Sequence, residues 1–163
     1  MPATRSADAA PIKHALTFAE TMRGMCHEVT GARRARLVSM EVHAETCRDS
    51  LLRGLVHEGS TFMLRGSMHV ETLCENGPCE GTLRMAPRDL ARALIYEIRF
   101  DDDAGAPCVL YGEKRIRGLS LISSMTTLYT EISRGEHKQP VLRGMLHFEL
   151  EYFLPWLKSF RLG

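Results

Sequence analysis

Two charged residues fall on strand faces that are otherwise apolar. Glu20 shares the period-2 face of Phe18 and Met22, and Lys114 shares that of Leu110. If these faces line a core, both charges point inward, where a lone charge has to pair, shift its pKa, or contact a ligand or water. An apolar cavity with a few convergent polar groups is the usual form of a small-molecule site. Glu20 and Lys114 are therefore candidate ligand-binding residues; the alternatives are a structural ion pair near a barrel end, or strands that face the other way.

Tyr129 and His147 are further candidates for a polar patch in the same interior. A catalytic alternative is an isomerase or cyclase in which Glu20 acts as a base beside Lys114 in a dry cavity. It ranks last, because no spacing of nucleophile, base and orienting group supports it. The sequence also lacks the glycine-rich phosphate loops, the nucleophile elbow and the HExxH helix, so no catalytic residue is assigned and no cofactor is expected.

A metal site is a weaker candidate. Cys26, His27, His43 and Cys47 are soft ligands close together in the sequence. Adjacent residues on a strand point to opposite faces, so Cys26 and His27 do not converge as a zinc site requires. We therefore expect no metal and interpret these histidines as surface or satisfied core residues.

The elements that must position these residues are mostly strands, because apolar residues recur with a period of 2. Asn76-Gly77 is a strong hairpin signal. Two helices are also expected, over 48–58 and over 151–162, from apolar residues at helical spacing. The expected strands are 16–26, 37–45, 62–73, 80–85, 94–100, 109–116, 125–132 and 141–149.

About eight sequential antiparallel strands predict an all-β fold, a lipocalin-like barrel with one inserted helix and a C-terminal helix. A two-sheet sandwich is the alternative, and the pattern alone does not separate the two. Residues 1–13 are expected to be a disordered lead-in, and residues 14–163 a single barrel domain.

Composition limits the classes of partner that the sequence predicts. Lys plus Arg number 21 and Asp plus Glu number 20, so the chain has no basic excess for nucleic acid, and the cluster Arg33, Arg34 and Arg36 is interpreted as a solvated loop or strand start. No apolar run approaches eighteen residues and no signal peptide is evident, which predicts a cytoplasmic protein. Five cysteines without a signal peptide indicate reduced thiols, although Cys74 and Cys79 flank a turn sequence and could pair across a hairpin.

Four short motifs carry a family resemblance. They are 18–24 (FAETMRG), 111–114 (YGEK), 126–129 (TTLY) and 144–148 (GMLHF). In order and spacing they resemble an accessory region found beside cholesterol-oxidase-like GMC oxidoreductase and α/β-hydrolase domains in large bacterial proteins. The match spans roughly 16–161 and includes both Glu20 and Lys114. It departs from the family at Ala19, where the family usually has Thr, and at Glu113, where the family usually has an apolar or aromatic residue.

The resemblance implies an accessory domain that stands alone here; the flavin and hydrolase motifs of the neighbouring domains are absent. The first functional hypothesis is a non-catalytic barrel that binds a sterol or fatty-acyl compound, with Glu20, Lys114, Tyr129 and His147 as the ligand-binding residues. The second is a barrel filled by its own side chains that docks on a partner oxidoreductase or hydrolase, or on itself.

Overall fold

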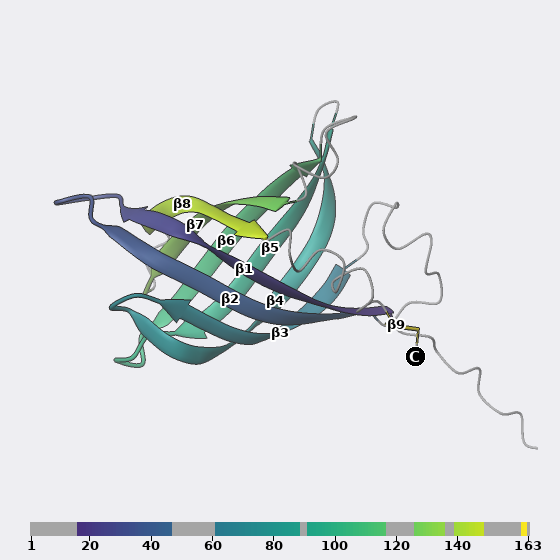
Figure 1. The fold of residues 1–163 in the computed structure, drawn as a ribbon, viewed down its shortest axis with the longest axis horizontal. Helices are drawn as coiled ribbons and strands as arrows, with labels where there is room; N and C mark the ends of the chain where they lie inside the picture. Colours follow the sequence, from purple (N-terminus) through teal and green to yellow (C-terminus); the bar gives the residue numbers. More distant parts are fainter. Residues whose placement is uncertain are drawn as a thin grey trace, which may run out of the picture.

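A computed structural model describes residues 16–46, 61–88, 91–116, 126–135, 139–148 and 161–162 of the chain. Antiparallel strands make up almost all of this part (Figure 1). Their bounds are β1 (Leu16–Glu28), β2 (Ala35–Thr46), β3 (Thr61–Val70), β4 (Cys74–Arg88), β5 (Ala91–Asp101), β6 (Pro107–Ile116), β7 (Thr127–Arg134), β8 (Pro140–Phe148) and β9 (Arg161–Leu162). No helix in the described part has the length and hydropathy needed to cross a membrane.

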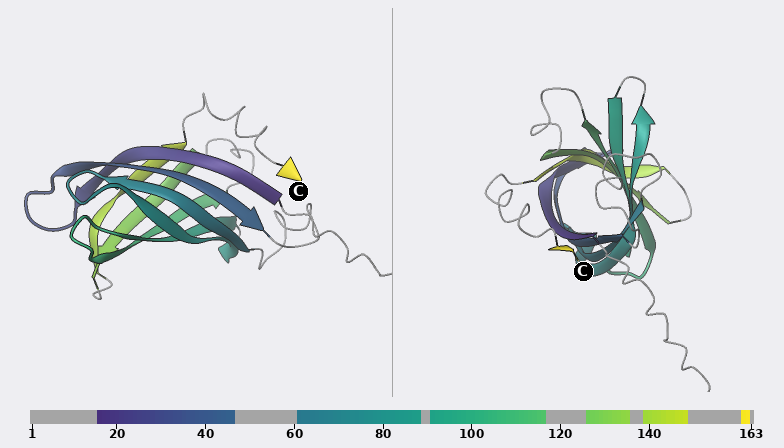
Figure 2. Two further views of the ribbon diagram at one scale, coloured as in Figure 1. Left: turned by 90° about the horizontal axis from the view of Figure 1, so that it is seen from below. Right: turned by 90° about the vertical axis from the view of Figure 1, so that its right-hand side faces the viewer.

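Strands β1 to β8 form a closed barrel. Each pairs with the next one along the chain, and β1 closes the circle because it pairs with both β2 and β8. Seen along the barrel, the strands form a ring (Figure 2, right). The eight-stranded antiparallel barrel predicted from the alternation is thus confirmed, and the two-sheet sandwich is excluded.

The alternation of the sequence gives the barrel its inner face. Along β3 the inward positions Phe62, Leu64, Met68 and Val70 are buried, while their neighbours are more exposed. Inward side chains from all eight long strands meet in one apolar core, and Ala86, Ala93 and Ile95 form a second, smaller cluster on β4 and β5. Burial of these side chains is the main stabilising contribution to the fold.

Inward-facing glycines allow the sheet to curl into a narrow barrel. A Cβ atom on Gly24 would lie 2.0 Å from the carbonyl oxygen of Met145 on β8, and one on Gly66 would lie 1.9 Å from that of Glu41 on β2. Any other residue would force the neighbouring strands apart at these points. Glycine within a strand often marks such a close backbone approach or a sharp bend.

The hairpin between β3 and β4 differs from the sequence prediction. The chain turns at 71–73, where Thr72 has a φ of 64°, and not at Asn76-Gly77. Asn76, with a φ of 52°, lies instead in β4 beside a register irregularity opposite Met68 and Val70. The left-handed conformation that Asn-Gly favours is therefore used in a bulge rather than a tight turn.

The two predicted helices are not tested over most of their length. The helix expected at 48–58 and positions 151–160 of the C-terminal helix lie outside the described residues. The last two helical positions are wrong, because Arg161–Leu162 pair with Thr17 and Leu16 as the short strand β9. Positions 1–13, expected as a disordered lead-in, also lie outside the described part.

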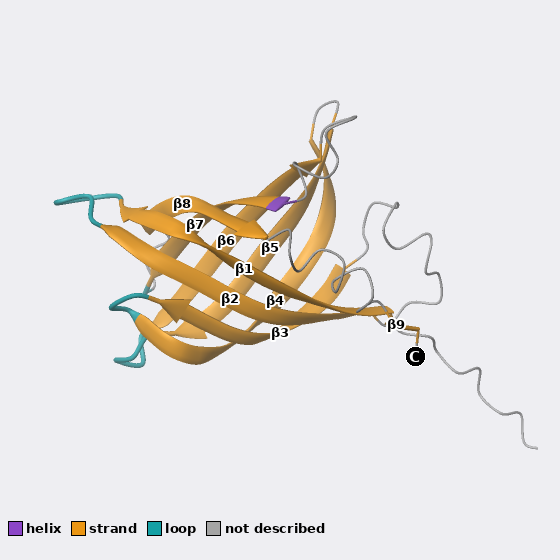
Figure 3. Ribbon diagram, in the orientation of Figure 1, coloured by secondary structure: helices purple, strands orange, loops and turns teal. Residues whose placement is uncertain are grey.

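The two ends of the barrel differ in their connections. The described turns at 29–34, 71–73 and 102–106 gather at one end (Figure 3). Asp102, on the last of these turns, accepts hydrogen bonds from the amides of Ala104 and Ala106 and pairs with Arg134. The amide of Ala106 and the Arg134 guanidinium hold the pKa of Asp102 below its ordinary value, since both stabilise the carboxylate.

Candidate functional site

A polar cluster crosses the interior of the barrel from one wall to the other. Glu20 projects inward from β1, and Tyr96 and Lys114 project inward from β5 and β6. In the strand order these two strands lie across the barrel from β1. We call Glu20, Tyr96 and Lys114 the lumen triad.

The triad is joined by short, direct contacts. Lys114 Nζ lies 2.8 Å from Glu20 Oε1, and the Tyr96 hydroxyl donates to Glu20 Oε2 at 2.7 Å. Lys114 Nζ is also 5.0 Å from the centroid of the Tyr96 ring, within range of a cation–π contact. Tyr96 is 0% exposed, Lys114 1% and Glu20 5%. The sequence-based expectation that Glu20 and Lys114 point inward is confirmed, and the structure brings the two together.

Burial changes the chemistry of Tyr96. Desolvation, followed by the charge of Glu20 and the hydrogen bond to it, raises the pKa of Tyr96 well above its ordinary value. The phenol therefore stays protonated in the folded protein and remains a hydrogen-bond donor to Glu20. Nothing in the sequence alternation singled out Tyr96 as a site residue, although the pattern placed it on the inward face of its strand.

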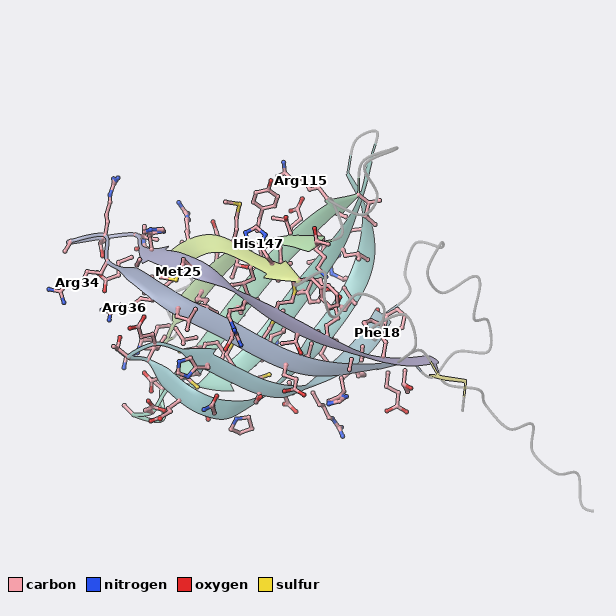
Figure 4. All side chains as sticks on the ribbon, in the orientation of Figure 1. Phe18, Met25, Arg34, Arg36, Arg115 and His147 are labelled. Atoms are coloured by element: carbon pink, nitrogen blue, oxygen red, sulfur yellow. The ribbon has the colours of Figure 1, made fainter. Side chains whose placement is uncertain are left out.

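Apolar side chains surround the triad on the side where β1 begins. Phe18 and Phe62 pack edge to face with their ring centroids 5.4 Å apart (Figure 4 labels Phe18). Leu83 and Phe148 are also buried in the core, and Leu94 packs against it while partly exposed. The lumen triad is thus a compact polar group in an apolar setting.

The structure does not bring Tyr129 and His147 to the triad. Tyr129 is 53% exposed on the outer face of β7, where Arg115 lies over its ring at 5.9 Å. His147 is exposed on β8, and its Nδ1 lies 3.4 Å from the Thr127 hydroxyl (Figure 4). Their predicted interior position is therefore wrong. The inward residues of β7 are Leu128, Thr130 and Ile132, so Tyr129 lies on the outward-facing side of the strand.

The thiols form a separate group at the other end of the barrel. All four described cysteines are buried and free. Burial raises the pKa of Cys26, Cys79 and Cys108 to about 11, so these thiols are protonated near neutral pH and behave as small apolar side chains. Cys74 and Cys79 both lie on β4 rather than facing each other across the hairpin, and no disulfide joins them in the structure.

The proposed soft ligands behave as the alternation predicts. Cys26 points into the barrel and its neighbour His27 is exposed, as is His43 on β2. Cys47 lies outside the described residues. Within the described part of the chain, no three His, Cys, Asp or Glu side chains lie close enough to hold a metal ion.

An open groove of about 600 Å³ lies over β3 to β6, away from the triad. Arg65 and Arg99 line it on either side of Glu80, their direct neighbour in the cross-strand register. This alternation of charge is typical of a solvated strand surface, and cross-strand pairs of opposite charge stabilise a sheet. The groove therefore gives a weaker indication of a site than the lumen triad.

Comparison with models of protein families, with curated proteins and with solved structures finds no match for this chain.

Loss of Lys114 should destabilise the protein more than loss of the whole ion pair. Lys114→Met leaves the Glu20 carboxylate buried without its counter-ion, a change that costs about 3–5 kcal/mol of unfolding free energy. The double variant Glu20→Leu/Lys114→Met removes both charges and should recover a large part of that loss. Urea unfolding of the two single variants and the double variant measures this coupling. Additive losses would contradict a direct interaction.

Alkaline titration should separate Tyr96 from the other tyrosines. Because its folded pKa is raised, the associated stability is fully present below pH of about 10 and is lost as pH rises toward the folded pKa. The chain has four tyrosines. In the folded protein, Tyr96→Phe should leave the tyrosinate absorbance at alkaline pH unchanged, and after unfolding it should lower that absorbance by the signal of one tyrosine. A lower signal already in the folded state would show that Tyr96 ionises there.

Proposed function

We propose that the protein is a non-catalytic binding module that holds an apolar small molecule inside the barrel. The lumen triad would contact the polar group of the ligand, and the apolar side chains around Phe18 and Phe62 would contact its body. Sterols and fatty-acyl compounds have this combination of one polar group and a large apolar body. In keeping with the family resemblance, we further propose that the module is accessory to an oxidoreductase or hydrolase of lipid metabolism.

The observation that carries this proposal is a charged pair inside an otherwise apolar barrel. A buried ion pair contributes little net stability, and replacing one with apolar residues of similar volume is often neutral or stabilising. The Glu20–Lys114 pair is therefore not explained by stability alone. A role in orienting a ligand accounts for its position, its burial and its surroundings.

Native mass spectrometry of the purified protein, followed by organic extraction, tests the proposal. We expect a bound lipid-sized molecule in the wild type and a reduced bound fraction in Lys114→Met. Met40→Leu is the matched control, because Met40 is a buried inward residue of β2 and the change conserves volume. A clean unliganded mass, together with no rise in Tm when sterol or fatty acid is added, would refute the binding function.

A row of exposed apolar side chains favours a second candidate function, self-association. Leu37 pairs with Met25, Met25 with Met145, and Met145 with Tyr129, so the row crosses β2, β1, β8 and β7. Each of the four is at least 37% exposed. Contiguous exposed apolar patches on soluble proteins mark interaction surfaces. Met25 lies on this outer face in Figure 4.

Light scattering after size exclusion, at several protein concentrations, tests self-association. We expect the wild type to form dimers or larger species and Met145→Lys to shift the population toward the monomer, because the new charge would be buried in the contact. Met63→Lys is the matched control, since Met63 is also an exposed methionine (54% against 45% for Met145) and lies on β3, outside the row. A wild type that stays monomeric throughout would exclude this candidate.

A further inference from the structure

We infer that the lumen triad selects a neutral hydroxyl group over a carboxylate. This inference rests on the proposed binding function and specifies the chemistry of the ligand. It follows from three properties of the triad: its net charge, its remaining hydrogen-bonding capacity and the distance between its charged atoms.

The hydrogen-bonding capacity of the triad exceeds the bonds within it. The ammonium of Lys114 has three N–H donors, and among the described residues its one hydrogen-bond acceptor is Glu20 Oε1. Each carboxylate oxygen of Glu20 accepts one bond from the described residues, from Lys114 or from Tyr96, and an ionised carboxylate has about four acceptor positions. The triad thus has both donors and acceptors left over, and Lys114 is almost fully buried.

A hydroxyl group matches this capacity because it donates one hydrogen bond and accepts others. Lys114 Nζ and Glu20 Oε1 are 2.8 Å apart, so a single oxygen atom can lie within hydrogen-bond distance of both. Such a hydroxyl would accept from the ammonium and donate to the carboxylate. A ketone could only accept, and it would leave the remaining acceptor positions of Glu20 unmatched.

The charge balance of the triad disfavours a carboxylate at the same position, because Lys114 is already neutralised by Glu20. Glu20 and Lys114 carry opposite charges, and Tyr96 is neutral because its pKa is raised. A fatty-acid carboxylate would bring a second negative charge beside Glu20 in a buried setting. Like charges at short distance disfavour each other strongly where solvent does not screen them. A ligand ammonium would meet the same penalty beside Lys114.

Two matched pairs of probes test this preference. Hexadecan-1-ol and hexadecanoate have the same chain and differ in the polar group; cholesterol and cholest-4-en-3-one differ chiefly in hydroxyl against ketone. Binding to the full-length protein is measured by native mass spectrometry at pH 8, where the fatty acid is ionised. We expect the alcohol to bind at least tenfold more tightly than the acid, or the sterol more tightly than its ketone. The pair that binds distinguishes a linear alcohol from a sterol.

Substitution of Glu20 provides a second and more specific test of the hydroxyl preference. Glu20→Gln removes the negative charge and leaves Lys114 as a net positive site, so the preference should reverse toward hexadecanoate. Met40→Leu should leave the wild-type preference unchanged. Equal or tighter binding of the acid to the wild type would overturn the hydroxyl inference while leaving the binding function in place. No binding of any of the four probes would overturn both.

Discussion

The ion pair between Glu20 and Lys114 ties opposite walls of the barrel together, and several other features follow from it. A buried charge is tolerated only with a partner at hydrogen-bond distance, so the register of β1 relative to the far wall is fixed within narrow limits. A one-residue slip of β1 would turn Glu20 outward and leave Lys114 alone in the core. Tyr96 strengthens the constraint, because its buried hydroxyl also depends on the same carboxylate.

The pair also depends on how narrow the barrel is. Gly24 and Gly66 let neighbouring strands approach more closely than any side chain would permit. Eight strands enclose an interior that side chains can fill or that holds one small ligand. The strands form a closed ring (Figure 2), and in its interior Glu20 on β1 contacts Lys114 on β6. The tight curvature of the sheet and the polar contact across it are therefore coupled.

The sequence predicts the barrel well, because the period of 2 recurs in eight long segments and most of them have one mainly apolar face. It predicts Glu20 and Lys114 for the same reason, as charges in phase with apolar neighbours. It does not predict that they meet, since they are separated by 94 positions and no local signal links them. The sequence does not predict Tyr96 as a site residue, because an inward tyrosine resembles any other core aromatic until the partner of its hydroxyl is known.

The errors have equally specific causes. In β7, hydroxyl-bearing residues occupy both phases, Tyr129 in the exposed one and Thr130 in the buried one, so the alternation did not place Tyr129 on the outer face. In the β3–β4 region, Asn76-Gly77 favours left-handed backbone, but a bulge uses that preference as readily as a tight turn does. Predicting the orientation of β7 and the position of the β3–β4 turn requires the pairing partner across the sheet, and a few residues of local sequence do not specify that partner.

The polarity of the interior is uneven along the barrel axis, and this asymmetry bears on the function. At the end with the turns, the cysteines are neutral because burial keeps their pKa near 11, so they contribute no charge. The Glu20–Lys114 pair lies toward the end where β1 begins and β6 ends, whereas Asp102, also buried, pairs with Arg134 on a turn at the opposite end. An amphipathic ligand would therefore have one favourable orientation, with its polar group at the triad. Under the proposed binding function, orienting the ligand is the property that would distinguish the ion pair from an apolar core of the same volume, because a buried ion pair adds little net stability.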